Sequence, residues 1–263
     1  MNETSLLQIT SLSKAFGGIQ AVRDYRLSLP AGAIYGLIGP NGAGKTTIFN
    51  LITGFLKPDK GTIIFNEVNI TGWRPDKVSR IGIARTFQIL RLYRALTVEM
   101  NILIAHHKQC DYSFWTIIGS LPKYIKCERK LREKALFLLD FFGLTEYRNV
   151  VVGNLPYGLQ RKVDIACALA TNPTLLLLDE PSCGMNPREA SELAELIAKA
   201  KQYFNLSLII VEHRMPFIMG IAQRIQVLNH GVLIAEGTPM EIQNHPKVIE
   251  AYLGVGNVIT KSQ

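Results

Sequence analysis

The chain has 263 residues, of which 48% are hydrophobic, and its 29 Lys and Arg outnumber its 21 Asp and Glu to give a net charge of +8. This composition favours a single domain of one or two lobes with a sizeable buried core, and it excludes an intrinsically disordered chain. The apolar runs are far shorter than the roughly 20 residues that cross a bilayer, and the first residues lack the basic and apolar regions of a signal peptide, so a cytosolic location is expected.

Strand patterns occur at the start of the chain and again in its interior. Segment 6–29, "LLQITSLSKAFGGIQAVRDYRLSL", is typical of antiparallel strands, and segment 61–71 resembles a hairpin. Three short apolar segments, 33–39, 174–180 and 206–213, have the form of strands buried on both faces, which is typical of a parallel sheet. The predicted fold class is therefore α/β, with an N-terminal antiparallel layer beside a mainly parallel sheet.

A glycine-rich loop follows the first buried strand. Residues 39–46, "GPNGAGKT", match the pattern G-x-x-x-x-G-K-[ST] between a strand and a helix, where the backbone N–H groups and the helix N-terminus attract phosphates. We expect Lys45 to reach the β- and γ-phosphates and the Thr46 hydroxyl to ligate Mg²⁺. The predicted nucleotide-binding residues of the loop are Gly39, Pro40, Asn41, Gly42, Ala43, Gly44, Lys45, Thr46 and Thr47.

Two adjacent carboxylates, Asp179 and Glu180, end the second buried strand in "LLLLDEP". Adjacent side chains of a strand point to different sides, so Asp179 can join the Mg²⁺ shell while Glu180 faces the water that attacks the γ-phosphate. Two acids at the end of a buried strand are costly without cations. A role in nucleotide hydrolysis is therefore favoured over a purely structural pair.

Helical patterns replace the strand patterns between about residues 87 and 163. In 127–144, "CERKLREKALFLLDFFGL", apolar residues recur three or four positions apart, and we interpret this region as a helical insertion into the α/β core.

Farther along, Asn186 is expected to cap a helix, with Glu189 completing a capping box, and "TPMEI" at 238–242 predicts a second box.

Three further motifs appear in order: "RTFQ" with Gln88, "LPYGLQ" at 155–160, and "VEH" with His213. Together with the glycine-rich loop and "LLLLDEP", they make the chain resemble the ATP-binding subunits of ABC transporters over nearly its whole length. The cofactors, domain organisation and partners given next are implied by this resemblance, and the motif spacing alone does not predict them. ATP and Mg²⁺ are the implied cofactors.

The resemblance also implies the domain organisation. A single ABC ATPase domain would span residues 6–254. Its P-loop NTPase core, of the RecA-like type, would comprise 6–88 and 164–254, and a helical subdomain with the signature motif would occupy 89–163. Residues 255–263 are expected to be a frayed tail.

In this family, two nucleotide-binding subunits hold two ATP molecules, each between the P-loop of one subunit and the signature motif of the other. The resemblance implies that Phe16 stacks on adenine, that Gln88 links the metal and the attacking water to the membrane subunit, and that Glu180 is the catalytic base. The implied catalytic residues are Lys45, Gln88, Glu180 and His213, the last as the γ-phosphate contact. The implied metal ligands are Thr46, Gln88 and Asp179. The implied signature residues, which serve the partner's ATP, are Leu155, Pro156, Tyr157, Gly158 and Leu159.

Several segments are similar to the ATP-binding subunit of branched-chain amino acid importers, a group with relatives for urea and other polar solutes. They are "GIARTFQILRLYRALTVEMNILIA", "SCGMNP" and "GTPMEIQNHPKVIEAYLG". The implied partners are a second ATPase subunit, two polytopic membrane permease subunits and an external solute-binding protein. This chain would then lie on the cytoplasmic face of the inner membrane, and segment 88–101 would help to receive a helix of the membrane subunit. Whether the ATPase dimer is homomeric or heteromeric stays open.

The signature motif departs from the family pattern L-S-G-G-Q, because Pro156 and Leu159 replace its second and fifth residues. Pro156 has neither a hydroxyl nor an N–H and can donate no hydrogen bond to a γ-phosphate. Gly158 and the N-terminus of a helix expected to start near Gln160 can still face the nucleotide. In a heterodimer, the two ATPase sites are therefore expected to be unequal.

Two other classes of function compete with transport. A soluble ABC protein that acts on DNA or ribosomes fits the charge of +8, but the basic residues are spread along the chain, and neither a second cassette nor a long coiled-coil insertion is visible. A regulatory subunit without turnover fits the unusual signature but leaves Glu180 and His213 unexplained. We therefore expect no nucleic-acid partner.

Overall fold

The computed structural model describes residues 5–106 and 121–253. Its strands are β1 (Ser5–Phe16), β2 (Ile19–Pro30), β3 (Ile34–Ile38), β4 (Lys60–Phe65), β5 (Val68–Asn69), β6 (Ile83–Arg85), β7 (Leu175–Asp179), β8 (Ser207–Val211), β9 (Arg224–Asn229) and β10 (Val232–Gly237). Its α-helices are α1 (Lys45–Ile52), α2 (Pro75–Arg80), α3 (Val98–His106), α5 (Leu121–Phe141), α6 (Tyr157–Ala170), α7 (Pro187–Tyr203), α8 (Met215–Ile221), α9 (Pro239–Gln243) and α10 (Pro246–Leu253). Short 3₁₀ turns lie at η2 (Thr145–Tyr147) and η3 (Val152–Asn154).

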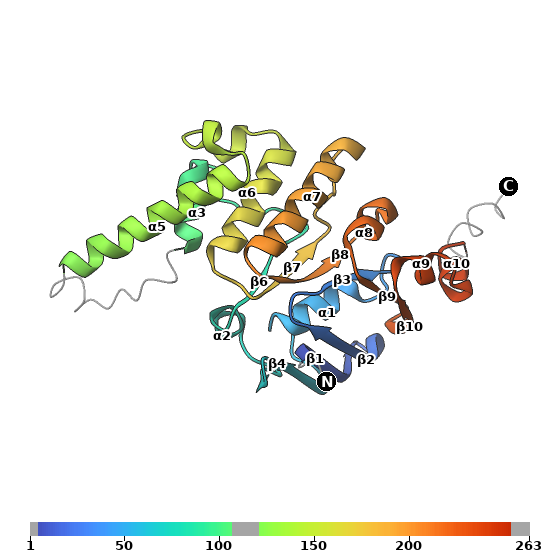
Figure 1. Cartoon of the computed structure of the whole chain (residues 1–263). Helices are drawn as coiled ribbons and strands as arrows, with labels where there is room; N and C mark the ends of the chain where they lie inside the picture. Colours follow the sequence, from blue (N-terminus) through green and yellow to red (C-terminus); the bar gives the residue numbers. More distant parts are fainter. Residues whose placement is uncertain (1–4, 107–120, 254–263) are drawn as a thin grey trace.

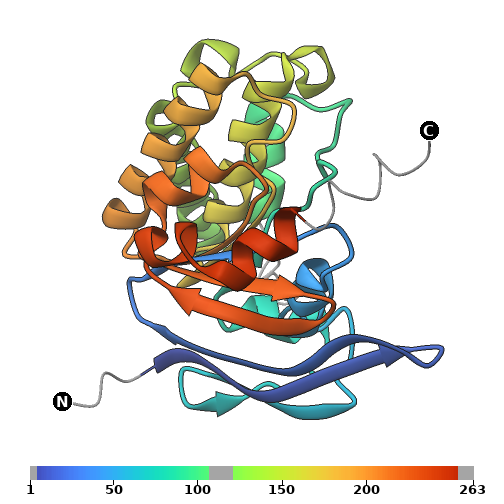
Figure 2. The same ribbon diagram turned by 90° about the vertical axis from the view of Figure 1, so that its right-hand side faces the viewer.

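The strands form two sheets that lie in separate layers (Figure 2). The four-stranded sheet, in the order β2-β1-β4-β5, is antiparallel throughout and includes the predicted hairpin as β4 and β5. The six-stranded sheet has the order β10-β9-β3-β8-β7-β6, and all its pairs are parallel except β9 with β10. The predicted α/β class with an antiparallel layer is confirmed.

Strands β3, β7 and β8 are buried at all five of their positions, because both faces of the six-stranded sheet are covered. In β7, Leu176 and Leu178 enter one hydrophobic core, whereas Leu175 and Leu177 enter a second core on the opposite face. Successive side chains of a strand point to opposite faces, so an unbroken leucine run fits this strand.

The helices divide between these two cores. Helix α1 packs between the sheets, where Ile48 and Phe49 join the core that also contains residues of β1. Helices α3, α5 and α6 form a group at one side of the molecule, and α7 and α8 lie beside it over the six-stranded sheet (Figure 1). The apolar positions expected in the insertion are all buried: Leu131, Ala135, Leu138, Leu139 and Phe142.

The signature helix starts earlier than expected. Helix α6 begins at Tyr157, with Pro156 at the N-cap in an extended conformation (φ −53°, ψ 147°), rather than near Gln160. Proline fits this position because its fixed φ is compatible with the start of a helix. As a result, Tyr157, Gly158 and Leu159 lie in the first turn of α6, which crosses the predicted division at 163/164.

Both predicted capping boxes are present. In α7, the Asn186 side chain accepts a hydrogen bond from the Glu189 N–H at 2.9 Å, and the Glu189 carboxylate accepts one from the Asn186 N–H at 3.0 Å. In α9, Thr238 and Glu241 make the same pair of bonds. The predicted tail at 255–263 lies outside the described residues. Among the residues that are described, no helix combines the length and the hydropathy that a membrane span needs.

We predict that Asn186→Ala lowers the free energy of unfolding by about 1 kcal/mol, because one orphan N–H of α7 loses its acceptor. Denaturant unfolding followed by circular dichroism measures the change. The exposed Gln202 lies near the other end of α7, and Gln202→Ala is the control, with a change expected within about 0.5 kcal/mol. Equal stability of the Asn186→Ala variant and the wild type would contradict the prediction.

Candidate functional site

The glycine-rich loop joins the end of β3 to the start of α1, and two of its glycines have no room for a side chain. Gly39 has φ +148°, and a Cβ there would lie 2.1 Å from the carbonyl oxygen of Leu228. Gly44 has φ +105°, and its Cβ would lie 2.4 Å from the carbonyl oxygen of Ala21. These glycines let the loop curve tightly against two neighbouring strands. The loop therefore has the compact form that a phosphate-binding site needs.

Lys45, the first residue of α1, is 6% exposed. Its ammonium donates hydrogen bonds to the carbonyl oxygens of Gly39 at 2.7 Å and Pro40 at 3.0 Å. The pKa of Lys45 is lowered, because the effect of burial outweighs the opposing effect of the Glu180 and Asp179 carboxylates. The loop thus places one cation beside the two predicted acids, and Thr46 and Thr47 follow in the first turn of α1.

Asp179 forms a buried ion pair with Arg85, the last residue of β6, at 2.7 Å; both side chains are 4% exposed. Arg85 also donates to the Asn50 side chain at 2.6 Å and lies near the rings of Phe49 and Phe87, 5.3 and 4.7 Å from their centroids. A buried carboxylate needs such a partner. Arg85 was not predicted from the sequence, because β6 has only three residues and its apolar pattern is too short to identify it as the neighbour of β7.

Glu180 lies between two of the residues predicted to act with it. The Gln88 amide donates to one carboxylate oxygen of Glu180 at 2.9 Å, and Nε2 of His213 lies 2.8 Å from the other. The Glu180 backbone is left-handed (φ +47°), and its N–H donates to the carbonyl oxygen of Val211 at 2.9 Å. Its side chain is 17% exposed, so the carboxylate is held in position and still reaches solvent.

This arrangement follows from the sheet. Strands β7 and β8 are parallel neighbours, and Asp179 pairs with Val211 at their carboxyl ends. The loops that follow these strands therefore begin side by side and carry Glu180 and His213. The carboxyl edge of a parallel sheet is the usual place for a ligand site in α/β proteins. The predicted group of Gln88, Glu180 and His213 is thus brought together from three segments of the chain.

Arg161 in α6 connects the signature helix to the Gln88 segment. Its side chain is fully buried, and its guanidinium donates to the backbone carbonyl oxygens of Phe87 at 2.8 Å and Gln88 at 2.9 Å. It also donates to the hydroxyl of Tyr157 at 2.8 Å. The role of Arg161 is not visible in the sequence, because its partners are mainly backbone atoms more than 70 residues away.

The remaining predicted residues, Phe16 and the signature, come from other segments of the chain. Phe16 ends β1, is 45% exposed, and has the ammonium of Lys14 5.7 Å from its ring centroid. In the signature, Leu155 is buried, whereas Tyr157 is 40% exposed with its ring against Gly184. Across 5–106 and 121–253, no hydrogen bond or ion pair joins Phe16 directly to Gln88, Glu180 or His213. The adenine contact stays a prediction.

The comparisons with known proteins agree with this geometry. The family model described as "ABC transporter" matches residues 22–183, and the model described as "Branched-chain amino acid ATP-binding cassette transporter" matches 232–257. The chain is 43% identical over 249 residues to the high-affinity branched-chain amino acid transport ATP-binding protein LivG of Escherichia coli (strain K12), with 95% of this chain and 98% of that protein covered. It is 40% identical to BraF of Pseudomonas aeruginosa, with the same coverage of 95% and 98%.

Solved structures show the same relationship. The ADP conformation of MJ1267, an ATP-binding cassette of an ABC transporter, has a TM-score of 0.83 at 32% identity and covers 95% of this chain and 99% of its own. A nucleotide-free ATP-binding cassette from an ABC transporter has a TM-score of 0.82, also at 32% identity, with 94% and 98% covered. The predicted P-loop NTPase fold is thereby confirmed. The chain belongs to the ABC transporter family and is one of its ATP-binding proteins, which are ATPases.

Proposed function

We propose that this chain hydrolyses ATP to power the uptake of branched-chain or related amino acids through separate membrane subunits, with Glu180 as its catalytic base. The placement of Glu180 between Gln88 and His213 carries the proposal for the chemistry. The names of the relatives, which are branched-chain amino acid transport ATP-binding proteins, support the proposal for the solute. The solute pocket itself would belong to other chains.

The residues of the site fit phosphoryl transfer to water. Lys45 would place its ammonium on the β- and γ-phosphates, after leaving the loop carbonyls that it now contacts. Glu180 would accept a proton from the attacking water on a carboxylate oxygen, and Gln88 would orient that water. His213 would donate from Nε2 to the γ-phosphate. Catalysis would then consist of positioning and charge stabilisation, as expected for this reaction class.

Mg²⁺ fits the oxygen donors of this site. The hydroxyl of Thr46, the carboxylate of Asp179 and the amide oxygen of Gln88 are hard ligands of the kind that Mg²⁺ prefers. Such a site completes its shell with phosphate oxygens and water, so no cluster of three His, Cys, Asp or Glu is required, and none occurs among the described residues. When bound, the ion would neutralise part of the negative charge of the phosphates. The ion pair with Arg85 would hold the Asp179 carboxylate in its orientation toward the ion.

A second ATPase subunit would complete each site. The exposed Tyr157 and the N-terminus of α6, where the signature lies, would face the nucleotide on the partner. ATP would close the dimer and hydrolysis would reopen it, which moves the membrane subunits between their two states. Pro156 weakens the partner's site in particular, because it takes the place of a hydrogen-bond donor.

The surface beside Gln88 suits a helix of a membrane subunit. Segment 88–101 carries the exposed apolar side chains of Ile89, Tyr93 and Met100, and Ile89 is 83% exposed. The exposed ring of Phe55 packs against Phe87, next to Gln88 in the chain. A cavity of about 310 Å³ opens there, with Phe55 and Phe87 in its lining. Exposed apolar patches of this kind mark binding surfaces. A helix bound here would sense the position of Gln88 directly, and the chain would lie at the cytoplasmic face of the inner membrane.

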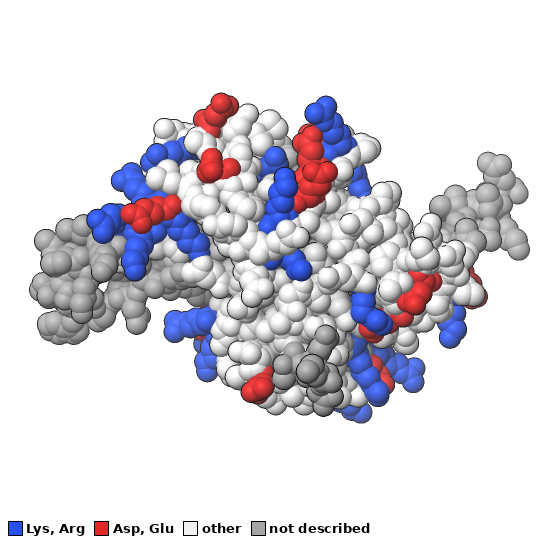
Figure 3. Space-filling model, in the orientation of Figure 1, with Lys and Arg blue, Asp and Glu red and all other residues white. Residues whose placement is uncertain are grey.

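Two alternatives remain distinct from this proposal. Urea, amides or another polar solute could replace amino acids, since the solute pocket would lie on other chains. A soluble protein that acts on nucleic acid or ribosomes is favoured only by the charge of +8. On the face in Figure 3, basic and acidic side chains are interspersed around a large uncharged area rather than gathered in one basic stripe. A nucleic-acid-binding surface usually shows a patch or stripe of clustered basic side chains.

Affinity isolation tests the proposed assembly. The Glu180→Gln chain, isolated from mildly solubilised membranes with MgATP, should retain two polytopic membrane subunits and a second ATPase, as measured by mass spectrometry. Ile89→Asp should release the membrane subunits, because it places a charge in the proposed docking surface. Val232→Asp is the matched control at an exposed apolar residue of β10, and it should keep them. Recovery of ribosomal proteins or nucleic acid instead would contradict the proposal.

A second prediction concerns the inequality of the two sites. In the heteromeric complex, Lys45→Ala should lower turnover at least about tenfold more than the equivalent change in the partner, because the partner's P-loop faces the weakened signature. Pro156→Ser should narrow the difference, because serine restores a hydroxyl and suits an N-cap. Steady-state ATPase rates of the unaltered complex and of the two lysine variants, each with and without Pro156→Ser, decide the question. Equal losses from the two lysine substitutions would refute unequal sites.

A further inference from the structure

Glu212 is a buried carboxylate next to the reacting group, and the proposed mechanism gives it no role. It follows β8 directly, precedes His213, and is 2% exposed. Because Asp179 pairs with Val211 across β7 and β8, Glu212 also lies beside the start of the loop that carries Glu180. A buried acid in this position needs a physical reason.

The Glu212 carboxylate accepts three backbone hydrogen bonds. One oxygen accepts from the N–H of Ser182 at 2.8 Å, in the loop after β7. The other accepts from the N–H of His213 at 2.9 Å and of Arg214 at 3.2 Å, in the loop after β8. Hydrogen bonds to an ionised acceptor are stronger than those between neutral groups. The single side chain therefore ties the loop of the catalytic glutamate to the loop of the catalytic histidine.

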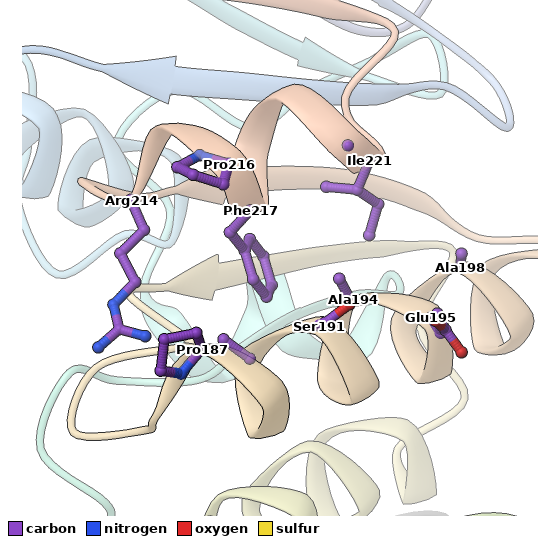
Figure 4. A pocket seen from close by; sticks show the side chains of 11 residues that line it. Pro187, Ser191, Ala194, Glu195, Ala198, Arg214, Pro216, Phe217 and Ile221 are labelled. Carbon is purple, nitrogen blue, oxygen red and sulfur yellow. The ribbon is translucent and has the colours of Figure 1, made fainter.

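Arg214 makes a second connection between the same two loops. Its guanidinium donates to the backbone carbonyl oxygen of Met185 at 2.5 Å. Figure 4 shows the Arg214 side chain extending from the start of α8 toward Pro187, at the start of α7, with Phe217 between the two helices. The loop after Glu180 is thus held at its beginning by Glu212 and at its end by Arg214.

The backbone conformation of Glu180 explains why the loop that carries it must be restrained by Glu212 and Arg214. At φ +47°, its backbone lies in the left-handed region, which glycine adopts freely and a glutamate rarely adopts. A residue in this region persists only when its surroundings determine the conformation. The next residues form a tight turn, in which the N–H of Cys183 donates to the carbonyl oxygen of Glu180 at 3.1 Å. Ser182, which Glu212 holds, lies within this turn.

We propose that Glu212 is a positioning residue for ATP hydrolysis. By holding the N–H groups of Ser182 and His213 together, it keeps the Glu180 carboxylate within hydrogen-bond distance of His213 and Gln88. Glu212 touches neither nucleotide nor water in this role and acts only through the two loops. The inference rests on the proposed function of Glu180 as the base.

Glu212→Gln is the most direct substitution. Glutamine has the same shape, but its amide group offers one acceptor oxygen and places a donor nitrogen against backbone N–H groups. Because displacement of reacting groups by about 1 Å can cost 10²-fold in rate, kcat for MgATP should fall about 10- to 100-fold. The KM for ATP should stay within about threefold, since the P-loop is unchanged. Glu192→Gln, at an exposed glutamate of α7, is the matched control and should keep the wild-type kcat.

A double-mutant cycle separates positioning from a general structural role. If Glu212 acts through Glu180, adding Glu212→Gln to Glu180→Gln should lower the residual turnover less than about threefold, because the group that it positions is already gone. Independent losses that multiply would contradict the inference. Backbone amide exchange gives a readout without activity: exchange at 182, 213 and 214 should be about tenfold faster in Glu212→Gln than in the wild type.

The outcomes distinguish this inference from the proposed function. Full turnover in Glu180→Gln would remove the base itself and so refute the proposed function. An inactive Glu180→Gln together with a wild-type kcat in Glu212→Gln would overturn only the role of Glu212. Unfolding of Glu212→Gln, or a loss of ATP affinity that matches its loss of kcat, would also overturn it, because the residue would then serve the fold rather than the geometry of Glu180.

Discussion

The Glu180 carboxylate, held between the Gln88 amide and His213, is the interaction on which the rest of the site depends. Gln88 and His213 lie 92 and 33 residues away from Glu180 in the sequence. Both contacts with the Glu180 carboxylate therefore depend on the six-stranded sheet, which brings these segments together. Strands β7 and β8 bring the loops together, and the helical insertion brings the Gln88 segment, through Arg161, to the same edge. The six-stranded sheet and the helical insertion therefore both contribute to the position of a single carboxylate.

Charge balance is the second constraint. The edge gathers Asp179, Glu180 and Glu212, and each acid is offset differently: Asp179 by the guanidinium of Arg85, Glu180 by an amide and an imidazole, and Glu212 by backbone N–H groups. Buried ion pairs add little net stability, because desolvation offsets their attraction. We interpret the Arg85–Asp179 ion pair as orienting the carboxylate oxygen that is proposed to bind the metal, rather than as a source of stability.

The sequence predicted what is encoded locally. Glycines at 39 and 44, Lys45 after them and the capping box at Asn186 are short-range patterns, and the leucines of β7 report burial on both faces. Arg85, Arg161 and Glu212 escaped prediction because their partners lie far along the chain or are backbone atoms. Helix α6 begins at Tyr157 and not near Gln160, because Pro156 serves as its N-cap as well as removing a hydrogen-bond donor from the signature.

The central claim is that Glu180 takes the proton of the attacking water. Single-turnover release of γ-phosphate from bound MgATP, compared between the wild type and Glu180→Gln at equal ATP occupancy, tests it most directly. The account predicts unchanged ATP binding and phosphate release slower by about 100-fold or more in the variant, which is the size of effect expected for loss of a general base. Release at the wild-type rate would contradict the account and leave Glu180 as a structural residue.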